Sequence, residues 1–166
     1  MRGRDEESAV TRVALISDTH GLLRPAVSEA LAGAPLILHA GDVGKPDVLE
    51  TLERIAPVRA IRGNVDRGEW AARLPTDDVV EVADRLVYLI HDRNELALDP
   101  SGAGSGFDVV LSGHSHRPGS ETRDGVLYVN PGSCGPRRFS LPISMAWLTL
   151  GPTGTVPEVE FVTFDP

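Results

Sequence analysis

Three short apolar runs, each ended by a polar turn, constrain the fold of this chain more than any other feature. The runs cover residues 12–17 (RVALIS), 36–40 (LILHA) and 58–62 (VRAIR). Two helix-like segments, 25–32 and 46–55, separate the runs, and each begins with a proline, which is favoured in the first helical turn. Strands that alternate with helices in this way predict a parallel sheet with covering helices. In such sheets ligands bind outside the carboxyl ends of the strands.

Beyond residue 70 the pattern changes to a succession of strands with few helix signals. A helical turn is expected at 94–98, before a flexible loop at 99–106. Strands are expected at 78–83, 86–91, 108–113, 126–130, 143–150 and 158–164. We therefore expect a single α/β domain over residues 12–166, with a parallel half and an antiparallel half, after a flexible N-terminal tail over residues 1–11.

Length and charge limit the partners that we expect. The 166 residues fit one domain with one substantial core, and the net charge of −8 disfavours long nucleic acid, which needs a basic face. No apolar run approaches the roughly 20 residues of a membrane span, and no apolar segment typical of a secretory signal follows the N-terminus. We therefore expect a cytoplasmic protein with no membrane partner. Homo-oligomer formation stays open.

Metal-ligand residue types gather at the ends of the predicted strands. Seven side chains of this kind are Asp18, His20, Asp42, Asn64, His91, His114 and His116. Mixed imidazole and carboxylate ligands suit Mn, Fe, Ni, Co or Zn, and the absence of sulfur argues against a structural zinc finger. Seven ligands exceed the needs of one ion, but they would serve two ions about 3.5–4 Å apart if one carboxylate bridges them.

Each of these residues also has a plainer interpretation. Asp18 and Asp42 could cap helices, Asn64 could be a turn residue, and His91 could be a hydrogen-bonded core histidine. The joint placement at strand ends favours the metal interpretation. The fifth histidine, His39, lies inside a predicted strand, so we expect it to be buried and to support Asp42 without binding the metal.

The only cysteine, Cys134, lies in a predicted turn. It fits a reducing compartment. A role as catalytic nucleophile is a minor alternative, because no evident base lies near it to lower its pKa.

Six ordered motifs then suggest a family. They are SDTHG at 17–21, HAGD at 39–42, GNVD at 63–66, a histidine at 91, GHSH at 113–116 and NPGS at 130–133. Together they resemble the calcineurin-like metallophosphoesterases, and specifically the small single-domain phosphodiesterases of bacteria and archaea. The resemblance covers roughly residues 12–150. It implies a four-layer αββα sandwich, in which two mixed β-sheets pack face to face with helices outside.

The resemblance also implies roles for the seven ligands. Asp18, His20 and His116 would bind one metal ion, and Asn64, His91 and His114 a second, with Asp42 as the bridge. The two divalent ions would be Mn²⁺, with Ni²⁺, Co²⁺, Fe²⁺ or Zn²⁺ as alternatives. A metal-bridging hydroxide would attack the phosphorus of a small phosphodiester in line, with Asp42, Asn64 and His91 as catalytic residues. The alternatives are a phosphomonoesterase and a non-catalytic interaction protein of the same fold.

The chain departs from the family pattern at two positions. Many members carry a histidine directly after the motif asparagine, where this chain has Val65, so no group is assigned to protonate the leaving oxygen. Asp92 stands where the family often has glycine, and we expect it to face solvent, with a supporting role beside the metals as the alternative. Candidate phosphate contacts near the motif loops are Asn64, Arg62, Arg93, Arg117, Arg137 and Arg138.

Overall fold

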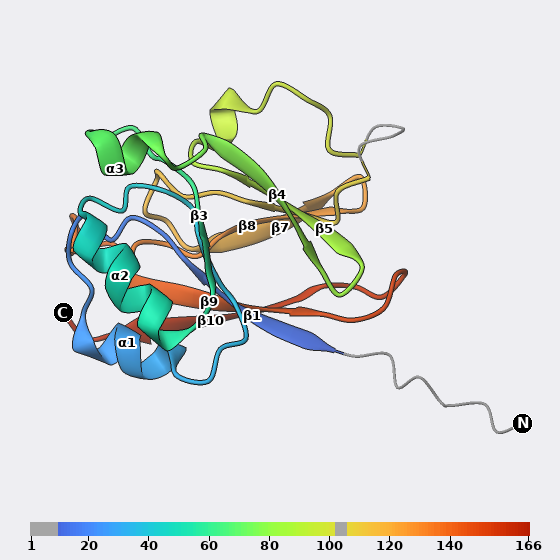
Figure 1. Cartoon of the computed structure of the whole chain (residues 1–166). Helices are drawn as coiled ribbons and strands as arrows, with labels where there is room; N and C mark the ends of the chain where they lie inside the picture. Colours follow the sequence, from blue (N-terminus) through green and yellow to red (C-terminus); the bar gives the residue numbers. More distant parts are fainter. Residues whose placement is uncertain (1–9, 102–105) are drawn as a thin grey trace, which may run out of the picture.

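Two five-stranded sheets face each other in the computed structural model, which describes residues 10–101 and 106–166 (Figure 1). The first sheet has the order β10-β9-β1-β2-β3 and the second the order β4-β5-β6-β8-β7. The strands of the first are β1 (Thr11–Ile16), β2 (Ile37–His39), β3 (Val58–Ala60), β9 (Ile143–Leu150) and β10 (Glu158–Phe164). Those of the second are β4 (Asp77–Val82), β5 (Arg85–Ile90), β6 (Val109–Leu111), β7 (Gly119–Arg123) and β8 (Val126–Asn130).

Each sheet is mixed, so the expected division into a parallel half and an antiparallel half of the chain was wrong. In the first sheet β1, β2 and β3 are parallel, while β9 runs antiparallel to both β1 and β10. In the second, β5, β6 and β8 are parallel and the edge strands β4 and β7 are antiparallel. The C-terminal hairpin joins the first sheet because β9 is almost wholly buried and needs a neighbour on each side. Local sequence patterns do not say which sheet that neighbour belongs to.

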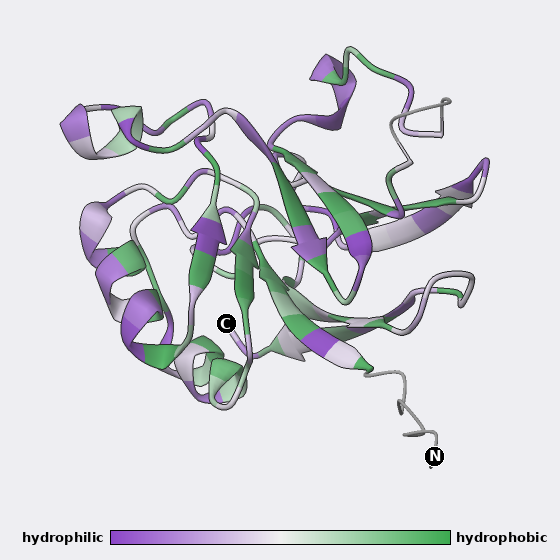
Figure 2. Cartoon of the chain, turned by 45° about the vertical axis from the view of Figure 1, so that its right-hand side comes forward, coloured by the Kyte–Doolittle hydropathy of each residue, from purple (hydrophilic) through white to green (hydrophobic). Residues whose placement is uncertain are grey.

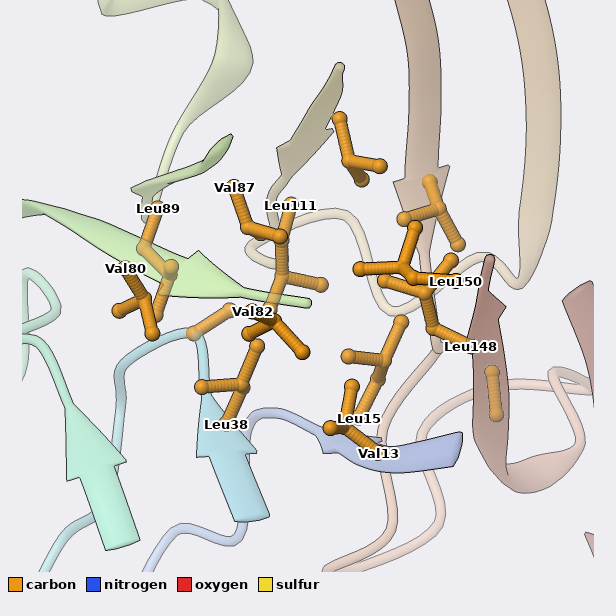
Figure 3. Close-up of a cluster of buried hydrophobic side chains, with 14 of the residues drawn as sticks. Val13, Leu15, Leu38, Val80, Val82, Val87, Leu89, Leu111, Leu148 and Leu150 are labelled. Carbon is orange, nitrogen blue, oxygen red and sulfur yellow. The ribbon is translucent and has the colours of Figure 1, made fainter. Parts of the chain in front are cut away.

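The core lies between the inner faces of the sheets. Alternate residues of β1, such as Val13 and Leu15, meet Leu89 and Leu111 of the second sheet in one cluster (Figure 3). The intervening residue Ala14 faces the other way, toward the helices. This two-sided burial explains why β1 reads as a continuous apolar run instead of an alternating one.

Helices cover the outer face of the first sheet. α1 (Pro25–Leu31) and α2 (Pro46–Ile55) pack their apolar residues against it, and Figure 2 shows that hydrophobic and hydrophilic residues alternate along both helices. The outer face of the second sheet carries little helix. There the short 3₁₀ helix η1 (Arg93–Glu95) and the segment that follows it bring Leu96 and Phe107 over Tyr88. The predicted sandwich of two mixed sheets is confirmed.

Two elements were missing from the sequence prediction. α3 (Glu69–Ala72) is a single turn after Gly68, and β7 is exposed along its whole length, so neither carries a periodic apolar pattern. The predicted helical turn at 94–98 begins one residue earlier, in η1. The predicted tail over 1–11 lies mostly outside the described residues, and Thr11 already belongs to β1. No helix among the described residues is long and apolar enough to cross a membrane.

Candidate metal centre

The seven predicted ligands come together at one edge of the sandwich, where the parallel strands of both sheets end. Three loops of the first sheet and two segments of the second supply them. Asp18 and His20 follow β1, Asp42 follows β2, Asn64 follows β3, His91 follows β5, and His114 and His116 follow β6. Because β1 to β3 are mutually parallel, as are β5 and β6, their carboxyl ends converge without any long excursion of the chain.

A first group consists of Asp18, His20 and His116. The two imidazole Nε2 atoms are 3.3 Å apart, and the Asp18 Oδ1 atom lies 3.3 Å from Nε2 of His116 and 3.6 Å from Nε2 of His20. The three donor atoms are close enough together to surround one ion. All three side chains are buried or nearly so.

A second group lies directly beside the first. His91 Nε2 is 3.2 Å from Asp42 Oδ2 and 3.0 Å from Asn64 Oδ1, and His114 Nδ1 is 3.2 Å from the same Asn64 oxygen. Asp42 Oδ2 is also 3.7 Å from His20 Nε2, so this carboxylate stands between the two groups.

The arrangement fits metal binding on grounds that are independent of any sequence motif. The Asp18 Oδ1 atom is fully buried and accepts no hydrogen bond from any described residue, although Asp18 Oδ2 is bonded to Ser17 Oγ at 2.6 Å. A buried carboxylate oxygen without a partner is costly. Its nearest polar neighbours are imidazole nitrogens, which are themselves metal-ligand atoms. A cation among these atoms would satisfy all of them at once.

The backbone at the centre is strained. Five of the seven candidate ligands have a positive φ angle: Asp18 (56°), His20 (46°), Asp42 (55°), His114 (69°) and His116 (62°). Non-glycine residues adopt this region rarely, and such residues cluster at functional sites where the surrounding structure holds them. Two glycines allow the backbone to pass close to the candidate carboxylate ligands. A Cβ atom at Gly63 would lie 2.0 Å from Asp42 Oδ1, and one at Gly113 would lie 2.6 Å from Asp18 Oδ2.

The protonation states of Asp18, Asp42 and His91 depend on their burial and on the acidic and basic side chains beside them. Burial would raise the pKa of Asp18, but the neighbouring imidazoles of His116 and His20 and the hydrogen bond from Ser17 outweigh burial and hold that pKa well below its ordinary value. Burial likewise would raise the pKa of Asp42, and its hydrogen bond with His91 lowers it overall. Burial would lower the pKa of His91, yet the two carboxylates raise it to about 9. Both carboxylates are therefore ionised and available as ligands.

His39 is the last residue of β2 and lies behind the candidate ligands. It is fully buried, its Nδ1 accepts a hydrogen bond from the Gly41 N–H at 3.2 Å, and its Nε2 is 3.0 Å from Thr19 Oγ1. The Thr19 hydroxyl in turn donates to the Val43 carbonyl at 2.8 Å. Burial lowers the pKa of His39 to about 4, so it is neutral. His39 thus connects the loop that bears Asp18 to the loop that bears Asp42.

Two further residues support the centre that sequence reasoning did not identify. Asp66 accepts hydrogen bonds from the N–H groups of Val43, Gly44 and Gly63, which joins the loops after β2 and β3. Its place in the GNVD motif was the available signal.

The second is Asn130, which begins the NPGS motif. Its side chain donates to the Gly113 carbonyl at 2.9 Å and to Ser115 Oγ at 3.0 Å. Asn130 therefore holds the GHSH loop that carries His114 and His116.

Asp92 lies beside the centre instead of in open solvent. Its Oδ2 atom is 3.7 Å from Nε2 of His114, and its Oδ1 atom accepts the Asn94 N–H at the start of η1. Cys134 is fully buried, with its thiol facing the Ser17 carbonyl. Burial raises the pKa of this thiol to about 12, which rules against the alternative of a catalytic nucleophile.

The candidate arginines fall into separate places. Arg93 and Arg117 line a groove of about 390 Å³ that begins at His114. Arg137 lines a different hollow, next to Phe164 at the end of β10. Arg62 follows β3 and is half-buried, and Arg138 is exposed in the loop before β9.

Comparison with known proteins places the chain in a family. The model of the calcineurin-like phosphoesterase superfamily domain matches residues 11–152. A probable metallophosphoesterase of Methanothermobacter thermautotrophicus is 36% identical over 131 residues, which cover 73% of this chain and 76% of that protein. The chain therefore belongs to the calcineurin-like phosphoesterase superfamily, whose members are metal-dependent phosphoric ester hydrolases, as its motifs predicted. A phosphodiesterase of Methanocaldococcus jannaschii is 27% identical over 140 residues, covering 74% of this chain and 84% of that protein.

Solved structures share the fold. A predicted phosphoesterase from Streptococcus pneumoniae is 25% identical with a TM-score of 0.71, over 93% of this chain and 90% of that one. Vps29 of Chaetomium thermophilum is 20% identical with a TM-score of 0.73, over 93% of this chain and 98% of that one. At this identity, the likeness to Vps29 concerns the fold alone.

Proposed function

We propose that this protein is a dinuclear metal-dependent phosphodiesterase that hydrolyses small phosphodiesters. The observation that carries the proposal is the position of Asp42 Oδ2, 3.2 Å from His91 Nε2 in one ligand group and 3.7 Å from His20 Nε2 in the other. One carboxylate within reach of two sets of imidazoles suits a pair of ions better than a single ion. The nitrogen and oxygen donors suit Mn²⁺ first, with Ni²⁺, Co²⁺, Fe²⁺ and Zn²⁺ as alternatives.

In this proposal some residues of the site would hold the metal ions and others would bind the phosphate. Asp18, His20 and His116 would hold one ion, while Asn64, His91 and His114 would hold the other and Asp42 would contact both. Bound there, the ions would activate a water molecule and stabilise the negative charge that develops on the phosphoryl group. No serine, threonine or cysteine nucleophile is then required.

Asn64 has a second task in this proposal. Its Oδ1 faces His91 and His114, which leaves the amide Nδ2 to donate a hydrogen bond to a phosphoryl oxygen. Arg117 lines the groove together with His114, and its guanidinium has no ion-pair partner among the described residues. We infer that Arg117 attracts the anionic diester.

The test is hydrolysis of bis-p-nitrophenyl phosphate and of p-nitrophenyl phosphate, with and without Mn²⁺, by wild type and by Asp42→Asn. We expect metal-dependent cleavage of the diester that exceeds cleavage of the monoester, and loss of both activity and bound metal in Asp42→Asn. Asp165→Asn, at the exposed C-terminus, is the matched control for the lost charge. Unchanged metal content in Asp42→Asn contradicts the bridging role, and faster cleavage of the monoester favours the phosphomonoesterase alternative.

A non-catalytic role as an interaction protein remains the rival from another class. All seven ligand positions are filled in this chain, which supports the enzyme. The proposed location is the cytoplasm, and its support is the single reduced cysteine. A metal-loaded protein that cleaves neither nitrophenyl ester would favour the interaction role.

A further inference from the structure

The groove beside the metal centre contains a stacked pair of side chains that the proposed chemistry does not use. The guanidinium of Arg93 lies over the ring of Tyr128, with its Cζ atom 4.3 Å from the ring centroid. Glu121 holds the edge of the same guanidinium in an ion pair. The lining of the groove includes His114, a candidate metal ligand, this pair, and further residues of β7 and β8. His114 is thus shared by the candidate metal centre and the groove, so an ester substituent that extends past His114 would lie in the groove.

The Arg93 guanidinium is fixed as a flat surface. Tyr128 covers one of its faces and Glu121 occupies its edge, while 36% of the Arg93 side chain stays exposed. A guanidinium plane whose rotamer is already set stacks on a planar ring without a further loss of side-chain entropy. The sequence suggested Arg93 as a phosphate contact. In the structure its guanidinium instead forms an ion pair with the Glu121 carboxylate.

The charges around the groove argue against a second anionic group. Arg93 is neutralised by Glu121, and Asp92 lies 3.7 Å from His114 at the entrance. Arg117 is the remaining cation of the lining. A substrate with one phosphate at the metal centre and an uncharged flat group in the groove matches this pattern, because the Arg93–Glu121 pair offers a neutral surface and the Asp92 carboxylate would repel a second phosphate near His114.

We propose that this groove is a specificity subsite for a planar aromatic substituent of the phosphodiester, which stacks on the exposed face of Arg93. The inference rests on the proposed phosphodiesterase function and names its substrate class. Nucleobases and simple aryl groups share the required chemistry, and both stack on arginine planes. We assign the groove to the substituent that stays on phosphorus, which is the group that the kinetic test varies.

The kinetic test compares three diesters with the same p-nitrophenol leaving group, whose second substituent is methyl, phenyl or thymidine. We expect kcat/KM to be about tenfold higher for the ring-bearing esters than for the methyl ester, a ratio typical of one stacked ring. A thymidine ester faster than the phenyl ester identifies a nucleobase subsite, and the reverse order identifies an aryl subsite. Equal values for all three esters overturn the proposal.

Substitution of Arg93 tests whether the preference for ring-bearing esters depends on the flat guanidinium or only on its positive charge. Arg93→Lys keeps the positive charge but removes the flat surface, so the preference for ring-bearing esters falls toward unity. Arg123→Lys is the matched control, because Arg123 pairs with the same Glu121 but does not line the groove. Asn94→Trp fills the groove from η1, and Glu95→Trp places the same side chain one residue away, outside the groove. An undiminished preference in both Arg93→Lys and Asn94→Trp overturns the proposal.

A binding measurement on metal-free protein keeps this inference distinct from the proposed function. Saturation-transfer NMR with thymidine 5′-monophosphate should show contact of the base protons with wild type and with Arg123→Lys, and much weaker contact with Arg93→Lys. This readout needs no turnover. Cleavage of none of the diesters together with base contact refutes the proposed function alone, and absence of base contact refutes a nucleobase subsite alone, while equal kcat/KM values for the three esters refute the aryl subsite as well.

Discussion

The Nδ1 atom of His91 donates a hydrogen bond to the carbonyl oxygen of Ala40 at 2.7 Å. This bond joins the end of β5 in the second sheet to the end of β2 in the first. Because Nδ1 carries a proton for this bond, a ring that gives up its other proton to bind a metal has its lone pair on Nε2, which faces Asp42 and Asn64. A hydrogen bond of this kind fixes the tautomer that a metal requires and the direction of its lone pair.

Replacement of His91 should therefore remove one metal ion and leave the other. In His91→Gln we expect the bound metal to fall from about two equivalents per chain to about one, and kcat/KM to fall roughly 100-fold or more. Metal analysis after dialysis gives the first quantity and bis-p-nitrophenyl phosphate hydrolysis the second. Retention of two equivalents would exclude His91 as a ligand.

His39→Gln is the contrasting variant, because His39 is buried behind the centre and holds loops instead of a metal. Loss of its bonds with Gly41 and Thr19 leaves buried polar groups unsatisfied, which destabilises the protein by about 2 kcal/mol. Urea unfolding of the metal-free protein measures this change in the free energy of unfolding. The folded fraction should still bind about two equivalents of metal, and binding of only one would make His39 a ligand.

The candidate site was predictable from sequence because its chemistry is local. Each predicted ligand lies within a few residues of the end of an apolar run, and parallel strands bring such ends to one edge. The supporting residues were less accessible. Asp66 and Asn130 act on backbone groups of other loops, and their partners are known only once the loops are folded. Arg93 was interpreted from its charge, and nothing in the sequence indicated Glu121 as its partner.

The assignment of strands to sheets was not predictable for a similar reason. The burial of β9 on both faces requires two neighbours, but a pattern of apolar residues does not name them. β7 escaped detection because a fully exposed edge strand has no buried face and therefore no alternation. Short, exposed and partner-dependent elements are the ones that tertiary contacts decide.

Cys134 should be inert in the folded protein. Burial raises the pKa of its thiol to about 12, so at about pH 8 almost no thiolate is present, and the side chain is inaccessible to reagents. We expect Ellman's reagent to leave the native protein unmodified over hours and to modify one thiol per chain in concentrated guanidinium chloride. Fast modification of the native protein would show that the segment around Cys134 opens readily.

Tyr88 should make stability depend on pH in the alkaline range. Its hydroxyl donates to Asp77 Oδ2 at 2.5 Å, and burial, followed by the hydrogen bond to Asp77, raises its pKa to about 12. A raised pKa stabilises the fold fully below the ordinary tyrosine pKa of about 10, and this contribution is lost as pH rises toward about 12.

Tyr88→Phe should thus be less stable than wild type by about 1–2 kcal/mol at pH 8, and the difference should shrink between pH 10 and pH 12. Urea unfolding at a series of pH values measures it. Asp77→Asn keeps a hydrogen-bond acceptor and removes the charge, so its tyrosinate absorbance should appear at lower pH than in wild type. A stability difference that does not vary with pH would contradict the role of this bond.

The side chain of Val65 carries no group that could protonate the leaving oxygen. Its backbone N–H donates to Asp42 Oδ1 at 3.1 Å, so this residue lies directly beside the proposed bridge, and the residue is 42% exposed. Valine transfers no proton, so diesters with alkyl leaving groups should be cleaved far more slowly than nitrophenyl esters, whose leaving groups need no protonation. Equal rates for the two kinds of ester would reveal another acid in the site.

Val65→His should supply the missing acid. An imidazole at this exposed position should raise kcat for alkyl leaving groups about 100-fold while changing nitrophenyl ester hydrolysis little. The rate on alkyl esters should also gain a descending limb above the pKa of the new imidazole, because only its protonated form donates. Val65→Gln adds a polar side chain of similar length that cannot act as an acid, and it should give neither the increase nor the new limb. A gain in Val65→Gln equal to that in Val65→His would assign the effect to substrate binding instead of proton transfer.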